Sequence, residues 1–209
     1  MFVDRTEAGR RLASELGKQD REYDLAAGVA RGGVPVAAEI ARILEIPLKV
    51  VVSNKIRAPW NPELAIGAVG EDGSYLREDR VFAIADITAE QFERSRREAL
   101  RELRRRVEVY GSVGEAAQGR AVVLVDDGVA TGMTLRVALL SLRNMGAGHI
   151  TVAVPVASPD AAQQLLRESD EAVILETPHA FMAVGQYYRS FPPVSDREVL
   201  RYLEESPQE

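Results

Sequence analysis

Short aliphatic runs alternate along the chain with segments of helical periodicity, and this alternation constrains the fold more than any other feature. The runs predict strands at residues 25–30, 48–53, 121–125, 150–156 and 172–175. The segments between them predict helices at residues 6–16, 35–44, 131–145, 159–168 and from Ser195 onward. Strands that alternate with helices favour a parallel sheet. We therefore predict an α/β fold: an open, mainly parallel, twisted sheet flanked by helices, in a single domain of residues 1–209.

The composition fits a globular domain and excludes several kinds of site. Of the 209 residues, 46% are hydrophobic and 28% are charged, which is enough apolar material for a core. The formal net charge of -6 argues against broad nucleic-acid binding, which usually needs a basic surface. The chain has no cysteine, and its only histidines are His149 and His179. Disulfides, cysteine zinc sites and three-histidine metal centres are therefore excluded.

The first residues and the length of the apolar runs predict where the protein works. Charged residues, Asp4 and Arg5, follow Met1 almost at once, so no secretory apolar stretch is visible there. No apolar run approaches the roughly 20 residues that span a bilayer. We expect a soluble, cytoplasmic protein without membrane contact.

The region between the second and third core strands interrupts the alternation. Residues 54–62 contain Pro59 and Pro62 and predict a loop. Strands are expected after it, at residues 65–69 and near 81–85, with a turn between them.

A long helix is predicted at residues 88–110, because Thr88 and Gln91 have the spacing of a capping box. Its many arginines indicate a solvated helix face rather than a polyanion surface. We expect an insertion at about residues 72–118 that caps the sheet as a smaller hood or packs on a partner chain, as in a homodimer. A C-terminal extension is expected at about residues 177–209.

Residues 122–134 carry the strongest chemical signal. Four aliphatic residues lead into Asp126 and Asp127, and a short loop with Gly128 and Gly132 leads on to a predicted helix. Such a loop points backbone N–H groups at a phosphate, and the helix dipole adds partial positive charge. The paired carboxylates can accept hydrogen bonds from hydroxyls or bind a cation. A phosphate joined to a sugar with two neighbouring hydroxyls would satisfy both ends, whereas a simple helix cap would need only one acid.

This segment resembles the 5-phosphoribosyl-1-diphosphate (PRPP) signature of the type I phosphoribosyltransferases, in which an aliphatic strand, two acids and a loop ending in Thr-Gly follow one another. The resemblance implies that Asp126 and Asp127 engage the ribose hydroxyls. It also implies that the next loop wraps the 5-phosphate of PRPP. That loop comprises Gly128, Val129, Ala130, Thr131, Gly132, Met133 and Thr134.

The same resemblance implies a pyrophosphate loop after the first core strand, where Ala30, Arg31, Gly32 and Gly33 stand. An arginine beside two glycines is by itself as compatible with a simple turn as with a binding site. Together with the PRPP motif, these residues are expected to bind pyrophosphate. The family also often has a non-proline cis peptide in this loop, and we expect it between Ala30 and Arg31.

A third element follows the second strand, where type I enzymes have a mobile loop that often brings a basic residue to the pyrophosphate. Lys55 or Arg57 could have this role, and an ordinary charged rim is the alternative. The expected catalytic set is therefore Asp126, Asp127, Arg31 and Lys55. The loop itself would act as a lid that keeps water out.

The resemblance implies transfer of the 5-phosphoribosyl group from PRPP to a nitrogenous base, with release of pyrophosphate, in purine or pyrimidine salvage. Mg²⁺ is expected through PRPP, without a metal site assigned to the protein. A non-catalytic PRPP-binding regulator is the alternative, since it would keep the sugar-phosphate site without the chemistry.

The sequence leaves the acceptor base open. Hypoxanthine-guanine members typically carry a third acid before the Thr-Gly, where this chain has Ala130, a form that looks more like adenine or xanthine enzymes. His179 has no serine or carboxylate constellation near it and is interpreted as structural. The aromatic residues that could stack on a base, or belong to the core, are Trp60, Phe181, Tyr187 and Tyr188.

Overall fold

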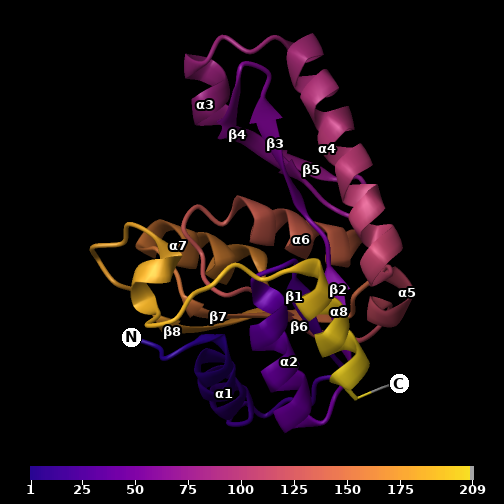
Figure 1. Cartoon of the computed structure of the whole chain (residues 1–209), viewed down its shortest axis with the longest axis vertical. Coiled ribbons are helices and arrows are strands. Elements are labelled where there is room, and N and C mark those ends of the chain that lie inside the picture. Colours follow the sequence, from indigo (N-terminus) through magenta and orange to yellow (C-terminus); the bar gives the residue numbers. More distant parts are fainter. Residues whose placement is uncertain (208–209) are drawn as a thin grey trace.

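The computed structural model describes residues 1–207, and its centre is a sheet of five parallel strands in the order β2-β1-β6-β7-β8 (Figure 1). These strands are β1 (Leu25–Val29), β2 (Leu48–Val51), β6 (Ala121–Val125), β7 (His149–Val156) and β8 (Glu171–Glu176). The chain continues from β1 to β2 on one side and from β6 to β7 on the other side of the sheet. The carboxyl ends of β1 and β6 therefore flank a topological switch point. Open α/β sheets bind ligands at such a point. The predicted fold class is confirmed.

Helices cover both faces of this sheet (Figure 1). They are α1 (Arg5–Leu16) and α2 (Gly33–Leu44) on one face, and α6 (Met133–Asn144) and α7 (Pro159–Glu168) on the other. Val123 and Val125 of β6 belong to the buried cluster that includes α1 and α2. Val122 and Leu124 belong to the cluster that includes α6 and α7. Because successive strand residues point to opposite faces, a strand covered on both sides requires the continuous aliphatic run seen in the sequence.

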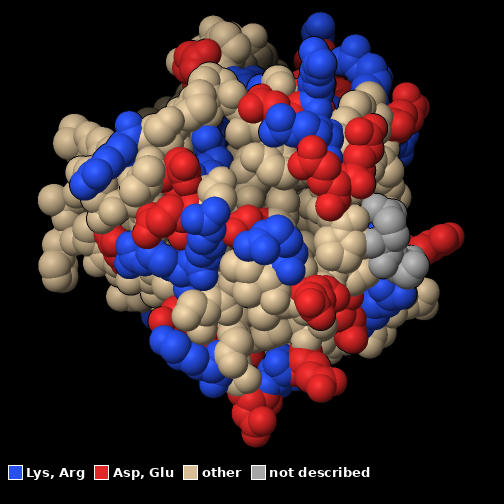
Figure 2. All heavy atoms as spheres, turned by 60° about the horizontal axis from the view of Figure 1, so that its bottom comes forward, with Lys and Arg blue, Asp and Glu red and all other residues tan. Residues whose placement is uncertain are grey.

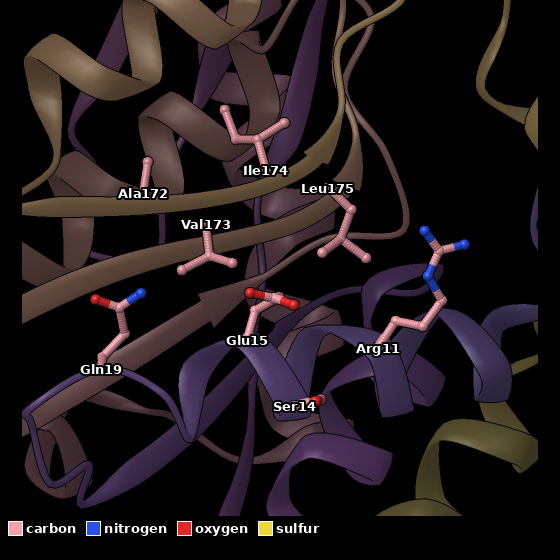
Figure 3. A pocket seen from close by; sticks show the side chains of 8 residues that line it. All are labelled: Arg11, Ser14, Glu15, Gln19, Ala172, Val173, Ile174 and Leu175. Atoms are coloured by element: carbon pink, nitrogen blue, oxygen red, sulfur yellow. The ribbon is translucent and has the colours of Figure 1, made fainter.

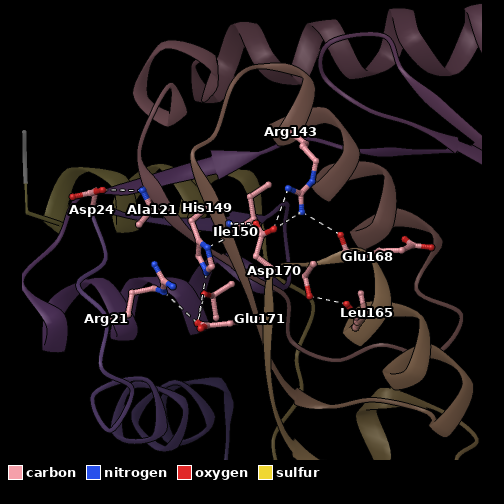
Figure 4. A network of polar contacts seen from close by, with 12 residues as sticks. Arg21, Asp24, Ala121, Arg143, His149, Ile150, Leu165, Glu168, Asp170 and Glu171 are labelled. Carbon is pink, nitrogen blue, oxygen red and sulfur yellow. Dashed lines mark hydrogen bonds and ion pairs between the residues drawn. The ribbon is translucent and has the colours of Figure 1, made fainter.

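Acidic side chains fix the starts of the strands, at the edge opposite the switch point (Figure 4). Asp24 accepts a hydrogen bond from the N–H of Ala121 at 2.7 Å, and Asp170 accepts one from the N–H of Ile150 at 2.8 Å. Arg143 donates to the same Asp170 carboxylate at 3.2 Å. Burial acts to raise the pKa of Asp170, but these hydrogen bonds outweigh it, so the pKa lies below its ordinary value. This network has a structural role.

A second sheet of three antiparallel strands, in the order β3-β4-β5, stands above the first (Figure 1). With two helices it forms the hood, which we define as residues 54–110. Its elements are β3 (Asn54–Ala58), β4 (Asn61–Val69), β5 (Tyr75–Arg77), α3 (Asp79–Ile84) and α4 (Ala89–Tyr110). The hood therefore begins directly after β2, earlier than the boundary expected near residue 72. The short helix α5 (Gly114–Ala117) leads back to β6.

The expected loop at residues 54–62 is wrong, because this stretch forms β3, a turn and the start of β4. Along β3, buried residues alternate with exposed ones, as a strand with one covered face requires. Pro59 lies in the turn. Pro62 lies where the pairing of β3 with β4 shifts register, so its missing N–H is tolerated.

The strand expected near residues 81–85 is also wrong, since most of this stretch lies in helix α3. The strand that pairs with the second half of β4 is β5 instead, in the register Val69 to Tyr75. The turn between them contains Gly73 at a φ of +88°, a conformation that favours glycine. The turn was thus placed correctly, but the second strand follows it immediately.

Helix α4 begins with the predicted capping box. The side chain of Thr88 accepts a hydrogen bond from the N–H of Gln91 at 3.2 Å, and Gln91 accepts one from the N–H of Thr88 at 2.9 Å. Leu103, on the buried stripe of the helix, is fully enclosed. The side-chain amide of Asn54, at the start of β3, donates to the carbonyl oxygen of Ala99 at 3.2 Å. The helix therefore packs along β3 and stiffens the hood.

After β8 the chain runs over the carboxyl edge of the sheet and returns to the first residues (Figure 1). This part contains the short helix η1 (Val184–Tyr187) and the helix α8 (Asp196–Glu205). The N–H of Phe2 donates to the carbonyl oxygen of Tyr187 at 2.7 Å, and the N–H of Arg189 donates to that of Phe2 at 2.9 Å. Residues 2–3 and 187–190 thus lie side by side at the edge that carries the switch point.

Figure 2 shows the face of the molecule that is at the bottom of Figure 1. Basic and acidic side chains are interspersed over this face, without an extended area of either sign. A protein surface that binds a nucleic-acid backbone concentrates basic side chains, and this face does not have that pattern. None of the helices within residues 1–207 combines the length and the apolar character needed to cross a bilayer.

Candidate functional site

The loops that follow β1 and β6 meet at the switch point, and their contact defines the candidate site. A methyl group built on Gly32 would lie 2.2 Å from Oδ2 of Asp127, and one built on Gly33 would lie 2.5 Å from the carbonyl oxygen of Val125. Both distances are far inside van der Waals contact, so these positions require glycine. The fold therefore brings together the expected pyrophosphate loop and the expected acid pair.

Asp126 follows β6 directly and is half-buried. Its Oδ1 accepts a hydrogen bond from the N–H of Asp127 at 2.9 Å. Burial raises the pKa of Asp126 well above its ordinary value, and the neighbouring Asp127 carboxylate raises it further. Two carboxylates in one site resist carrying two negative charges. The pair is therefore suited to receive a hydroxyl donor or a cation.

Asp127 is held through both its side chain and its backbone by residues that are distant in the sequence. Nε and Nη2 of Arg5 donate to its Oδ2 at 2.9 and 2.7 Å, and the hydroxyl of Tyr188 donates to its carbonyl oxygen at 2.6 Å. Burial raises the pKa of Asp127, and the opposing effect of Arg5 does not cancel it. No local motif in the sequence links Arg5 or Tyr188 to the acid pair, and Tyr188 was expected only as a residue that stacks on a base or belongs to the core.

The expected phosphate loop, residues 128–134, turns sharply onto the N-terminus of α6. Gly132 is the N-cap of this helix at a φ of +76°, which favours glycine. A methyl group on Gly128 would lie 2.5 Å from the side chain of Val184 in η1. The hydroxyl of Ser158 donates to the carbonyl oxygen of Ala130 at 2.6 Å and so fixes the far side of the turn. A glycine turn that opens onto a helix N-terminus is a geometry that binds phosphate.

The loop after β1 has the cis peptide bond that was expected between Ala30 and Arg31. The guanidinium of Arg31 donates to Oδ1 of Asp196, the first residue of α8, at 3.3 Å. The same oxygen accepts a hydrogen bond from the hydroxyl of Tyr110 at the end of α4. Arg31 is therefore tied to α8 and, through Asp196, to the hood. The sequence carried no signal for this contact.

Lys55 lies exposed on β3 and not on a loop above the acid pair. With Arg57 it lines a cavity of about 280 Å³ between the β3–β4 hairpin and α4, where Glu98 and Glu102 also lie. Within residues 1–207, no hydrogen bond or ion pair joins Lys55 to Asp127 or to the loop after β1. The structure thus brings together Arg31, the acid pair and both glycine loops, and the role expected of Lys55 stays a prediction.

The aromatic residues that could stack on a base occupy different environments. Tyr188 is 6% exposed and packs on Phe2 with ring centres 5.4 Å apart, so it belongs to the core. Phe181 and Tyr187 stack on each other at 5.3 Å. Trp60 is 53% exposed in the turn of the β3–β4 hairpin. None of these rings is singled out as the base platform.

A separate cavity of about 500 Å³ lies between α1 and the free edge of β8 (Figure 3). Arg11, Ser14 and Glu15 line it from the helix, Gln19 from the turn after the helix, and Ala172, Val173, Ile174 and Leu175 from the strand. None of these residues belongs to the loops after β1 and β6. This cavity is therefore distinct from the candidate site.

The residues at the switch point fit a magnesium ion that is bound mainly by a ligand. Within residues 1–207, no cluster of three or more His, Cys, Asp and Glu side chains is placed to enclose a metal ion. Mg²⁺ commonly binds through one or two carboxylates together with substrate phosphates and water. Asp126 and Asp127 supply that kind of donor set, and their mutual repulsion would be relieved by a cation.

An acid pair, a phosphate-type turn and a glycine loop face one another across the switch point, and together they define an α/β protein suited to a phosphorylated sugar. The match of a family model makes the class specific. The chain belongs to the phosphoribosyl transferase family, because the model described as "Phosphoribosyl transferase domain" matches residues 4–189. The matched region includes both loops, the five-stranded sheet and the hood.

Comparisons with individual proteins agree with this assignment. The chain is 41% identical over 206 residues to the Mycobacterium tuberculosis protein named "Putative phosphoribosyl transferase Rv0571c". The match covers 98% of this chain and 46% of that protein, so the chain spans about half the length of the curated relatives it matches. The crystal structure of TT1426 from Thermus thermophilus is 40% identical, with a TM-score of 0.78 and 99% of each chain covered.

A more distant structure has the same fold. The purine phosphoribosyltransferase from Pyrococcus horikoshii has a TM-score of 0.50 to this chain, at 20% identity, with 93% of this chain and 97% of that chain covered. At this identity the similarity concerns the fold and does not indicate a base.

Proposed function

We propose that this chain transfers the 5-phosphoribosyl group of PRPP to a ring nitrogen of a nucleobase and releases pyrophosphate. The observation that carries the proposal is the close approach of Gly32 to the Asp127 carboxylate. It sets a loop suited to pyrophosphate directly against a pair of acids suited to ribose hydroxyls. In PRPP the carbon that carries the pyrophosphate is next to a carbon that carries a hydroxyl, so the groups that bind them must also be adjacent.

Each part of the site would act on one part of PRPP. The backbone N–H groups of residues 128–134 and the N-terminus of α6 would hold the 5-phosphate. Asp126 and Asp127 would accept hydrogen bonds from the ribose hydroxyls and stabilise the positive charge that develops on the ribose as pyrophosphate leaves. Arg31 and the amides of the loop after β1 would stabilise the leaving pyrophosphate.

Asp126 and Asp127 would lie beside a magnesium ion that enters the site with PRPP. When bound, it would supply neutralisation of the negative charge that collects on the leaving group. The residues of the chain would position the sugar independently of the ion, through the acid pair and the phosphate loop.

The acceptor is proposed to be a purine or pyrimidine base in a salvage reaction in the cytoplasm. Ala130 is exposed at the turn of the phosphate loop, where an acid would otherwise contact a 6-oxopurine. This feature makes a hypoxanthine or guanine acceptor the less favoured choice. A homodimer formed through the hood also stays a prediction, which size-exclusion chromatography with light scattering would test.

A regulator that binds PRPP without turnover is the second candidate. The observation that favours it is the position of Lys55, which lies on β3 beside Glu98 and Glu102 rather than on a lid above the acid pair. An enzyme makes bound PRPP reactive and therefore needs a lid that keeps water from hydrolysing it. A binding protein would have no need of such a lid.

The deciding experiment measures pyrophosphate release with Mg²⁺ and PRPP across a panel of purine and pyrimidine bases, together with calorimetric binding of PRPP. Release with at least one base supports the transferase, whereas tight binding without release on any base supports the regulator.

The double variant Asp126→Asn/Asp127→Asn tests the acids. It is expected to weaken PRPP binding at least about 100-fold, because it removes two charged carboxylates that would accept hydrogen bonds from the ribose. Asp20→Asn, an exposed aspartate outside the site, is the matched control. Unchanged binding in the double variant would contradict the assignment of the acids.

A further inference from the structure

Arg5 is on the first turn of α1, yet it is buried against the candidate site, with only 9% of the residue exposed. Nε and Nη2 donate to Oδ2 of Asp127, and Nη1 donates to the carbonyl oxygen of Pro192 at 2.8 Å. The guanidinium carbon lies over the ring of Phe191, 3.8 Å from the ring centre. Every nitrogen of the guanidinium therefore donates to a protein atom. Arg5 is held in place by these contacts and is not free to bind a substrate itself.

The contact restricts how Asp127 can present its carboxylate. Both hydrogen bonds from Arg5 reach the same oxygen, Oδ2, which fixes the rotation of the group. Gly32 packs against this oxygen from the other loop. The remaining oxygen, Oδ1, is then the one that can accept a hydrogen bond from a ligand. A carboxylate that turned freely would be a poorer acceptor, because neither oxygen would be held toward the ligand.

The tail segment, which we define as residues 188–192, supports the same arrangement from the other end of the chain. The ring of Tyr188 stacks on Phe191 at 4.8 Å, and its hydroxyl donates to the carbonyl oxygen of Asp127. Arg5 therefore lies between the acid it orients and a segment that is anchored to the backbone of the same acid. The side-by-side course of the N-terminal residues and this segment is visible in Figure 1.

We propose that Arg5, supported by the tail segment, is a positioning residue of the ribose site that holds the Asp127 carboxylate turned so that Oδ1 faces a ribose hydroxyl. The inference rests on the proposed function for the identity of the ligand. The hold of Arg5 on Asp127 can be measured without any ligand, so the two proposals can fail separately.

The first test follows the titration of the Asp127 carboxyl by NMR in the full chain labelled with ¹³C at aspartate. The charged and titratable groups that face Asp127 are Asp126 after β6, Arg5 on α1 and Tyr188 on the tail segment. Arg5→Gln is expected to raise the midpoint by about one pH unit or more, because an opposite charge at this distance favours ionisation. Arg5→Lys keeps the charge and should raise it less. An unmoved midpoint in folded Arg5→Gln overturns the proposal.

The second test measures PRPP affinity by calorimetry. Arg5→Gln is expected to bind at least about tenfold more weakly, since the lost contact is a two-point charge-assisted hydrogen bond. Arg5→Lys should recover part of the loss. The matched control is Arg10→Gln on the same helix, whose side chain is 62% exposed and pairs with Glu39, and it should stay within about twofold of the natural chain. Equal affinity of Arg5→Gln and the natural chain overturns the proposal.

The outcomes separate the two proposals. A natural chain that neither binds PRPP nor releases pyrophosphate refutes the proposed function, and the titration still decides whether Arg5 contacts Asp127 in solution.

Should Arg5→Gln not fold, Tyr188→Phe provides the second variant, because it keeps the ring and removes only the hydrogen bond to Asp127. A threefold or greater loss of PRPP affinity at unchanged Tm supports the proposal, and unchanged affinity contradicts the role of the tail segment.

Discussion

Arg31 and Asp196 form an ion pair that joins the loop after β1 to the first residue of α8, with 3.3 Å between Nη1 and Oδ1. Their side chains are 45% and 63% exposed, so the pair is accessible to water. Exposed pairs of this kind contribute only about 0.2–1 kcal/mol. An anionic ligand can therefore draw Arg31 away from Asp196 at small cost.

Removal of this competition should strengthen pyrophosphate binding. Asp196→Asn weakens the restraint on Arg31, and we expect pyrophosphate to bind up to about fivefold more tightly, the factor that corresponds to 1 kcal/mol. Calorimetric titration with pyrophosphate measures the change. Asp79→Asn, which disturbs the exposed pair of Asp79 with Arg77 in the hood, is the control. Weaker binding in Asp196→Asn would instead mean that Asp196 orients Arg31 for the ligand.

The acid pair should reduce the stability of the folded chain at neutral pH. The pKa of Asp126 is raised by burial and by Asp127, so the contribution of this group to stability is present at low pH and declines as the pH rises through the folded-state pKa. Asp126→Asn keeps an acceptor for the N–H of Asp127 and removes the charge.

We therefore expect Asp126→Asn to increase the free energy of unfolding at pH 7.5, because the variant no longer carries a buried charge beside Asp127. The gain should shrink as the pH falls and vanish below about 4, where the unfolded chain is protonated as well. Urea unfolding followed by circular dichroism at several pH values measures it. Asp20→Asn should show no such pH dependence, and a destabilised Asp126→Asn at pH 7.5 would refute the interpretation.

The close approach of the two loops should make Gly33 intolerant of any side chain. A methyl group there meets the carbonyl oxygen of Val125 at 2.5 Å and the Cα of Asp126 at 2.9 Å, and neither backbone atom can move without shifting β6. Gly33→Ala is expected to lower the free energy of unfolding by about 1–3 kcal/mol, as overpacking does. Urea unfolding gives the value.

The matched control is Gly17→Ala. A methyl group on Gly17, at the end of α1, would meet its nearest neighbour, the carbonyl oxygen of Ala13, at 3.4 Å, which is close to ordinary contact. This variant should remain within about 0.5 kcal/mol of the natural chain. Equal stability of the two variants would show that the loop after β1 relaxes more than its packing suggests.

The sequence allowed the core of the fold to be predicted almost residue by residue, because strands covered on both faces leave continuous aliphatic runs. Strand β6 and helix α7 have the predicted bounds, and the Asp126–Asp127 motif stands at the predicted edge. The hood was predicted less well. Two prolines in nine residues suggested a loop at 54–62, whereas the alternation of burial along β3 is the stronger physical signal.

The supporting contacts of the site could not be predicted, for a different reason. Hydrophobic periodicity reports that a side chain is buried, but it does not report which distant segment buries it. Arg5 and Asp127 are separated by 122 positions, and Arg31 and Asp196 by 165. Both pairs are formed by packing of residues from the N-terminal part of the chain against segments that follow much later.

The contacts that Arg5 and Tyr188 make with Asp127 affect the order in which the candidate site can form during synthesis. Arg5 leaves the ribosome long before Phe191 and Pro192, which enclose its guanidinium. A nascent chain that stops before residue 184 would contain all five strands of the main sheet and both glycine loops. It would still lack Phe191 and Pro192, so the surroundings of Arg5 and Asp127 can be completed only after residue 192 has emerged.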